Sequence, residues 1–180
     1  MPLPIQDVER ELTHTRRVRF EGYRRADGLW DIEAHLTDIK NHDYPLQTGV
    51  RRAGQAIHEM WVRITIDRGL NVIDATAVSD AVPYPGGCDN APPAYKKLIG
   101  LNLRRGFRKK VHELLGGVQG CTHITEMLAG LPTAAIQTFA GCPLKLDTVK
   151  WLMLLATIVW FIAATPWMWK DNGGERQDVA

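Results

Sequence analysis

The segment Leu29-Trp-Asp-Ile-Glu-Ala-His-Leu-Thr-Asp-Ile39 decides the fold prediction. Its side chains alternate, apolar at Trp30, Ile32, Ala34 and Leu36 and polar at Asp31, Glu33 and His35. A period of two residues is typical of a β-strand that buries one face. We therefore expect a half-buried strand over residues 29–39.

The residues before this strand predict its hairpin partner. Residues 15–25 also alternate, with Val18 and Phe20 on one side, and Asp27-Gly28 is a turn signal between the two segments. The polar side of the first strand is rich in arginine and that of the second in carboxylates, so cross-strand ion pairs are expected. We interpret the acidic residues of the second strand as arginine partners rather than catalytic groups (Asp31, Glu33 and Asp38).

Two more strands are expected, over residues 57–66 and 70–78, after a polar loop over residues 40–55 that contains Pro and Gly. A second loop rich in Pro and Gly follows them. The strands all precede the segments with a helical pattern. This order indicates an antiparallel sheet of about four strands followed by helices, an α+β fold.

Three helices are predicted after the strands. Asn90 is expected to cap a short one, a second covers residues 105–115, and a third begins at Cys121, where Thr122 is the expected cap. Pro132 interrupts or restarts this third helix, which runs to about residue 140. Residues 1–147 are therefore predicted to form one α+β domain.

A different kind of segment follows the domain. Trp151–Trp169 contains no charged residue and carries Trp at both ends, which predicts a transmembrane helix, and residues 170–180 form a polar tail. Lys145 and Lys150 precede the apolar run and favour a cytoplasmic domain, by the positive-inside rule.

Composition narrows the classes of function. The 180 residues carry a formal net charge of +2, too small for a nucleic-acid-binding protein, and the first residues lack the pattern of a signal peptide, so none is expected. Three cysteines at wide spacing do not suit a disulfide scaffold, so a reducing compartment is expected.

Four residues form the candidate metal site: His58, Cys88, Cys121 and His123. A strand start, a strand-exit loop and a helix start can meet at one end of a sheet, and two Cys with two His suit Zn²⁺ or Fe. Glu59 and Glu126 are the acid/base candidates beside it. Without a metal, Cys121 and His123 would only be a buried thiol and part of a helix start.

Two other classes of function stay open. The first is a metal-free module that binds a small carboxylate, with Arg24 and Arg52 as anion clamps. The second is a membrane-tethered interaction protein, inserted through Trp151–Trp169, whose protein partner is unknown. No nucleic acid is expected as a partner, and no reaction is assigned.

A series of motifs resembles a known bacterial family. The motifs are His14-Thr-Arg-Arg17, Gly22-Tyr-Arg-Arg25, Asp27-Gly-Leu-Trp-Asp-Ile-Glu33, His35-Leu-Thr-Asp38, His58-Glu-Met-Trp61 and Gly120-Cys-Thr-His-Ile-Thr-Glu126. Over residues 1–148 the chain is similar to the family known as domain of unknown function 2889, a resemblance that implies no activity. Members of that family continue past Asp147 with a Cys-His pair. The apolar tail is therefore either a gained anchor or an out-of-frame reading.

A second resemblance concerns layout only. In NifU-like iron–sulfur scaffold proteins, the ligands lie at positions in the order of strands, loops and helices comparable to those of His58, Cys88 and Cys121. This resemblance implies metal binding, but His58 stands where a carboxylate is expected in those scaffolds.

Overall fold

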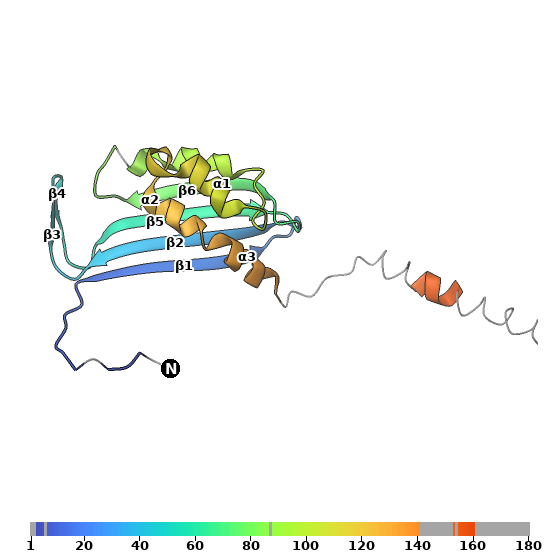
Figure 1. Cartoon of the computed structure of the whole chain (residues 1–180), viewed down its shortest axis with the longest axis horizontal. Coiled ribbons are helices and arrows are strands. Elements are labelled where there is room, and N and C mark those ends of the chain that lie inside the picture. The colour runs from blue at the N-terminus through green and yellow to red at the C-terminus, as the bar shows by residue number, and fades with distance from the viewer. Residues whose placement is uncertain (1–2, 6, 87, 141–152, 154, 161–180) are drawn as a thin grey trace, which may run out of the picture. The chain divides into compact units, whose positions relative to one another are not determined.

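The structure is a computed structural model that describes residues 3–5, 7–86, 88–140, 153 and 155–160, with only the backbone of Cys88. Contacts divide the chain into two units, residues 1–140 and 141–180, which are considered separately. The first unit contains the sheet and the helices drawn from blue to orange in Figure 1.

A four-stranded antiparallel sheet forms the first layer, in the order β1-β2-β5-β6. Its strands are β1 (His14–Arg24), β2 (Trp30–Lys40), β5 (Ala56–Ile66) and β6 (Val72–Ala81). The four predicted strands are confirmed. The predicted loop over residues 40–55 instead contains a separate small hairpin, β3 (Tyr44–Leu46) and β4 (Gly49–Arg51), at one end of the sheet (Figure 1).

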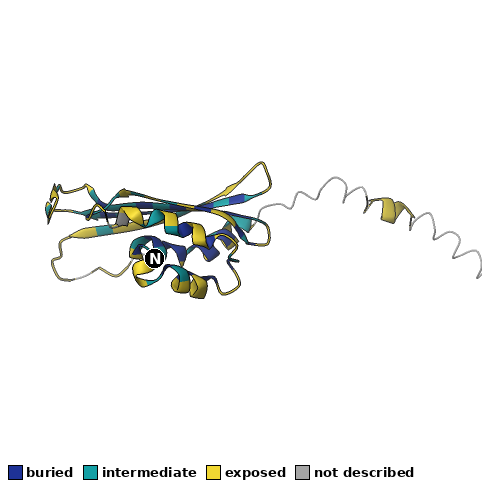
Figure 2. Cartoon of the chain, turned by 90° about the horizontal axis from the view of Figure 1, so that it is seen from above, coloured by how far each residue is buried: buried dark blue, intermediate teal, exposed yellow. Residues whose placement is uncertain are grey.

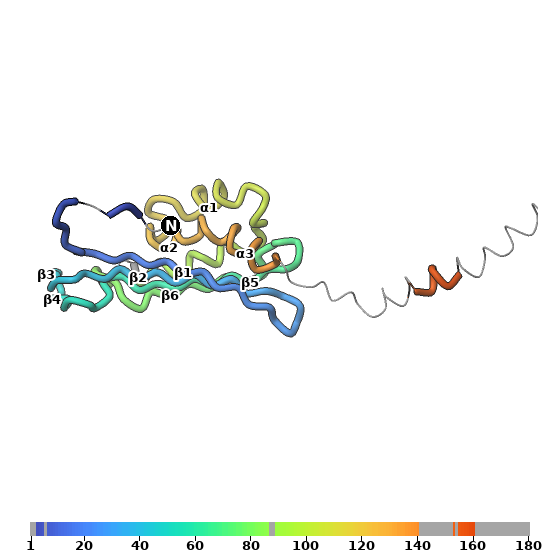
Figure 3. The backbone as a smooth tube through the Cα atoms, turned by 90° about the horizontal axis from the view of Figure 1, so that it is seen from below, coloured from blue at the N-terminus to red at the C-terminus, as the bar shows by residue number. Residues whose placement is uncertain are grey.

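The helices form the second layer and cover one face of the sheet (Figures 1 and 3). They are η1 (Cys88–Asn90), η2 (Pro92–Leu98), α1 (Phe107–Leu115), η3 (Gly117–Gln119), α2 (Thr122–Leu128) and α3 (Leu131–Phe139). Pro132 stands in the first turn of α3, where proline is tolerated, which confirms the predicted restart. The fold is therefore α+β.

The predicted helix caps are wrong. Cys121, not Thr122, is the N-cap residue of α2, and it makes no side-chain capping bond. The short helix before Gly100 is a 3₁₀-helix whose N-cap is Ala91, while the Asn90 side chain donates a hydrogen bond to the Gly86 carbonyl (2.7 Å).

The core lies between the sheet and the helices (Figure 2). The apolar residues of the β2 alternation are all buried, and they face buried leucines and isoleucines of the helices. At one end, the Trp30 ring contacts the Phe139 ring of α3, with 4.6 Å between the ring centroids.

Two glycines let α3 approach β1 closely. A Cβ atom on Gly22 would collide with the Thr138 side chain, and one on Gly130 would collide with the Phe20 ring. The helices therefore lie directly against the edge strand as well as against the centre of the sheet.

The predicted C-terminal helix over residues 151–169 falls mostly outside the described residues. Met153 and residues 155–160 are helical and exposed, while the rest of the segment and the predicted tail over residues 170–180 lie outside the described part. Among the residues that the structure describes, no helix has the length and apolar character to cross a membrane. The predicted transmembrane helix is therefore not supported.

Candidate functional site

Asp38 is the centre of the candidate site. It continues the buried row of β2 one step beyond Leu36, and its residue surface is 4% exposed. In the sheet register it lies directly between Arg16 of β1 and His58 of β5. A carboxylate at a buried position needs charged or hydrogen-bonding partners, and both neighbouring strands supply them.

Arg16 holds both oxygens of Asp38. Its Nε donates to Oδ1 and its Nη2 donates to Oδ2, each at 2.8 Å, which is the two-pronged arginine–carboxylate geometry. His14 Nε2 lies 2.9 Å from Oδ1. The edge strand therefore fixes the carboxylate from one side.

His58 contacts Asp38 from the other side. Its Nδ1 lies 3.1 Å from Asp38 Oδ2. Because an ionised carboxylate can only accept hydrogen bonds, Nδ1 carries the proton and Nε2 keeps a free lone pair. This is the arrangement in which a carboxylate sets the tautomer of a histidine.

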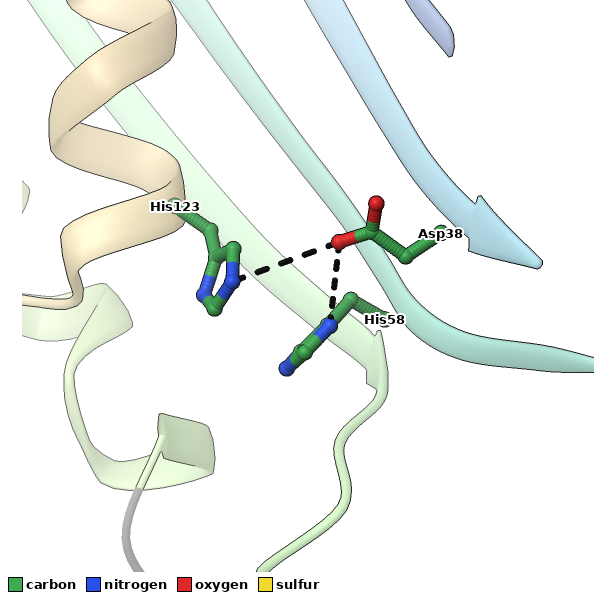
Figure 4. Close-up of side chains that lie close together, drawn as sticks. All are labelled: Asp38, His58 and His123. Atoms are coloured by element: carbon green, nitrogen blue, oxygen red, sulfur yellow. Dashed lines mark hydrogen bonds and ion pairs between the residues drawn. The ribbon is translucent and has the colours of Figure 1, made fainter. Parts of the chain in front are cut away.

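His123 completes the site from α2. Its ring lies 3.9 Å from the His58 ring, centroid to centroid, and its Nε2 is 4.0 Å from Asp38 Oδ2 (Figure 4). One ligand atom each of Asp38, His58 and His123 lies within 4.8 Å of the others. Three elements, β2, β5 and α2, thus place one carboxylate and two imidazoles around one point.

The charges at the site follow from burial and from Arg16. Burial raises the pKa of Asp38, but the hydrogen bonds from Arg16 and His14 and the Arg16 charge outweigh it and lower the pKa to about 2. Burial is also the main cause that lowers the pKa of His58, with the proximity of His123 next, and the main cause for His123, with the Arg16 charge next. Both imidazoles are therefore neutral at pH 7, beside an ionised carboxylate.

The start of α2 is anchored by a buried tyrosine. The Tyr95 hydroxyl of η2 accepts a hydrogen bond from the Cys121 N–H (3.0 Å), and it lies 2.9 Å from both the Cys121 carbonyl and the Thr125 hydroxyl. Because His123 is the second residue of α2, this anchor fixes where its imidazole meets the sheet.

The structure brings together three of the four predicted metal ligands. His58 and His123 are in contact, and the buried Cys121 lies beside them, with its Sγ 3.9 Å from His123 Nδ1 and 3.8 Å from Met60 Sδ. The side chain of Cys88, the fourth predicted ligand, lies outside what the structure describes.

The two acid/base candidates lie on different sides of the sheet. Glu126 of α2 is near the site, where its Oε2 accepts a hydrogen bond from Arg16 Nη1 (3.1 Å). Glu59 alternates with His58 along β5 and so points to the opposite face, where its Oε1 lies 3.2 Å from His35 Nε2.

Arg24 and Arg52 lie at opposite ends of β2. Arg24 pairs with Trp30 in the register and its guanidinium lies 5.9 Å from the centre of the Trp30 ring. Arg52 follows β4 near Lys40 and donates to Asp43. Because β2 is about 33 Å long at the usual rise per residue, Arg24 and Arg52 lie too far apart to hold one small carboxylate together. Each remains a separate prediction.

Three members of the site were missed: His14, Arg16 and Asp38. The sequence did contain a signal for two of them. Asp38 lies an even number of residues from Trp30, Ile32, Ala34 and Leu36, so it belongs to the same face of its strand. In the same way, Arg16 lies on the face of β1 that carries Val18 and Phe20. A charged residue that continues a buried row is a candidate for a buried ion pair.

Comparisons with known proteins place the chain in one family. No curated protein and no solved structure matches it, so the layout similarity to NifU-like scaffolds has no support. The family model described as "Protein of unknown function (DUF2889)" matches residues 14–137, a range that includes every residue of the site described above. The motifs noted in the sequence and this match agree, and the chain belongs to that family.

Proposed function

We propose that the domain binds one divalent transition-metal ion, Zn²⁺ or Fe²⁺, between His58 and His123 beside Asp38. The observation that carries this proposal is the approach of one ligand atom from each of the three side chains to within 4.8 Å of the others. The three residues come from separate elements, so this convergence is a product of the fold rather than of local sequence.

The donor set favours these two metals. Imidazole nitrogen is a common ligand of both zinc and iron, and His58 and His123 supply two such donors. Metal ligands must be deprotonated, and the lowered pKa values of His58 and His123 keep both rings neutral near pH 7. Hard cations such as Mg²⁺ and Ca²⁺ prefer oxygen-only sites and fit these side chains poorly.

Asp38 supports the site from the second coordination shell. Arg16 already binds both of its oxygens, and a guanidinium at 2.8 Å would repel a cation held on the same atoms. The hydrogen bond from His58 Nδ1 leaves Nε2 as the metal donor. The Cys121 thiol, 3.9 Å from His123 Nδ1, is the nearest further donor.

The chemistry that follows is metal-assisted. An ion with an open position lowers the pKa of bound water and polarises carbonyl groups. On this chain, Glu126 is the acid/base candidate on the same face, and Arg16 is the positive charge next to it. Among the described side chains, Cys121 is a free and buried thiol.

Elemental analysis of the full chain, purified without a metal-affinity tag, tests the proposal. We expect near-stoichiometric zinc or iron in the wild type and its loss in H58A and H123A. The matched control is H35A, which removes a histidine that also pairs with a carboxylate but lies on the other face. Wild-type protein without metal, or variants that retain it, would contradict the proposal.

The role of Asp38 has its own test. If Asp38 acts from the second coordination shell, the substitution Asp38→Asn should weaken Zn²⁺ binding by about 10- to 100-fold. Competition with a chelating dye measures this affinity. A complete loss equal to that of H58A would instead make Asp38 a direct ligand.

A further inference from the structure

We propose that Arg16 is the anchor of a binding subsite for a small carboxylate, and that the Glu126 side chain occupies this subsite in the structure. The inference deepens the proposed function, on which it rests for the metal ion that would lie next to the bound carboxylate. The carboxylate contact itself joins β1 and α2, and Glu126 also lines a cavity between α1 and α2.

The guanidinium of Arg16 is held in place by Asp38. Asp38 takes the Nε and Nη2 sides of the group, so the plane of the guanidinium is fixed and Nη1 faces away from the sheet. Arginine carries five N–H donors, of which Asp38 takes two and Glu126 one. A second carboxylate can therefore bind on the Nη1 side without loss of the Asp38 contact.

Glu126 shows which chemical group fits there. Its carboxylate lies 3.1 Å from Arg16 Nη1, 110 residues away in sequence, yet its side chain is 58% exposed. Exposed ion pairs of this kind are weak, because water competes for both partners. A carboxylate brought by a ligand has the same charge and geometry and can take the place of Glu126 when that side chain turns away.

A cavity beside Glu126 has room for the rest of such a ligand. The space between α1 and α2 measures about 310 Å³, the lower end of the range for small-molecule sites. Its lining includes the apolar side chains of Val111, Leu115 and Leu128 and the polar side chains of Arg108, His112 and Glu126, but not Arg16. Glu126 is the residue shared by the cavity and the Arg16 contact, so a ligand whose carboxylate takes the place of Glu126 would extend a compact, largely apolar body into this space.

The contact with Arg16 gives the ligand its sign. Arg16 Nη1 has the Glu126 carboxylate as its partner at 3.1 Å. A ligand carboxylate that replaces Glu126 supplies the same negative charge and hydrogen-bond acceptor, whereas a neutral ligand would leave the Arg16 Nη1 group without its counter-ion.

Titration of the full chain with benzoate tests the inference, with benzamide as the neutral probe of the same shape. Binding is followed by the ¹⁵N signals of the arginine side chains in metal-free protein. We expect benzoate to shift the Arg16 signal, benzamide not to shift it, and Glu126→Ala to tighten benzoate binding by about two- to fivefold, the strength of an exposed ion pair.

Glu113→Ala is the matched control. Glu113 is an exposed carboxylate of α1 that pairs with Lys110 at 2.7 Å, so its removal changes the net charge equally without freeing Arg16. An equal gain in E113A and E126A, no gain in E126A, or an unshifted Arg16 signal would overturn the inference. Because Glu126 is exposed and alanine favours helices, E126A is expected to fold normally.

A repeat of the titration with Zn²⁺ separates the two proposals. Tighter benzoate binding in the presence of Zn²⁺ supports both. If Zn²⁺ does not bind, the metal-free titration still decides the inference. If Zn²⁺ binds but E126A and the wild type bind benzoate equally, the inference fails and the proposed function stands.

Discussion

Strands β2 and β5 carry two histidine–carboxylate pairs, one on each face of the sheet. On the inner face, the carboxylate Asp38 belongs to β2 and the histidine to β5, with 3.1 Å between them. On the outer face the roles are exchanged, and His35 of β2 lies 3.2 Å from Glu59 of β5. Each histidine also contacts a ring: His35 stacks on Trp61 (3.5 Å between centroids), and His58 meets the tilted ring of His123 (3.9 Å).

The difference between the two pairs is the helix layer. The outer pair joins two strand residues, and its carboxylate side chain is 35% exposed. The inner pair lies next to α2, which contributes a second imidazole, and β1 adds an arginine. A histidine–carboxylate pair on a sheet is thus a local contact, and it becomes a candidate site only where a third element closes over it.

The largest expected difference is in stability. Asp38→Asn keeps the shape of the side chain but removes the charge that Arg16 binds at two points, so we expect a loss of about 2–3 kcal/mol in the free energy of unfolding. Glu59→Gln, on the exposed face, is expected to cost under about 1 kcal/mol. Urea unfolding followed by circular dichroism measures both, and equal losses would remove the distinction between the faces.

The pH dependence of stability sharpens the comparison further. Burial lowers the pKa of His58 and His123 below the ordinary value of 6.5, so the folded chain keeps them neutral while the unfolded chain protonates them. The unfolded state then binds more protons, and the free energy of unfolding falls as the pH drops below 6.5. In chelator-treated protein, the double variant H58Q/H123Q is expected to flatten this slope, and an unchanged slope would speak against neutral imidazoles.

Asp38 acts in a separate, more acidic window. Its folded pKa of about 2 lies below the reference value of 3.8, so its contribution is complete above pH 3.8 and is lost as the pH falls towards 2. The stability difference between wild type and D38N should therefore shrink over this interval.

The smallest expected effect belongs to the outer pair. His35→Ala removes a nearly parallel ring stack with Trp61, which should cost about 0.5–1 kcal/mol in urea unfolding. Metal content should stay at the wild-type level. A loss of metal in H35A comparable to that in H58A would show that the two faces are coupled.

The sheet could be predicted from the sequence because apolar and polar residues alternate along its strands, and the apolar ones of the β2 alternation are those that the fold buries. The four long strands agree with the predicted segments to within a few residues, whereas β3 and β4, three residues each, are too short to show a period. The helix starts also agree to within about two residues, but their capping residues were predicted wrongly, since the start of α2 is held by the bond between Tyr95 and Cys121 rather than by a capping side chain.

The candidate site was only partly predictable. His58 and His123 were selected for their chemistry, and their contact depends on where α2 lies on the sheet, which no local pattern specifies. Asp38 was assigned to the arginine partners, and its bond to Arg16 confirms that pairing. The predicted buried row ended at Leu36 and so did not include Asp38.

The contact between Arg16 and Glu126 spans 110 residues, and this distance has a consequence for the order of folding. The hairpins β1–β2 and β5–β6 join neighbouring segments, so little entropy is lost when their short loops close. They are therefore expected to form early. During synthesis, Asp38 and His58 leave the ribosome well before His123 does. We therefore expect the sheet to form before the candidate site is complete, with the docking of α2 as the late step that brings His123 to Asp38 and His58.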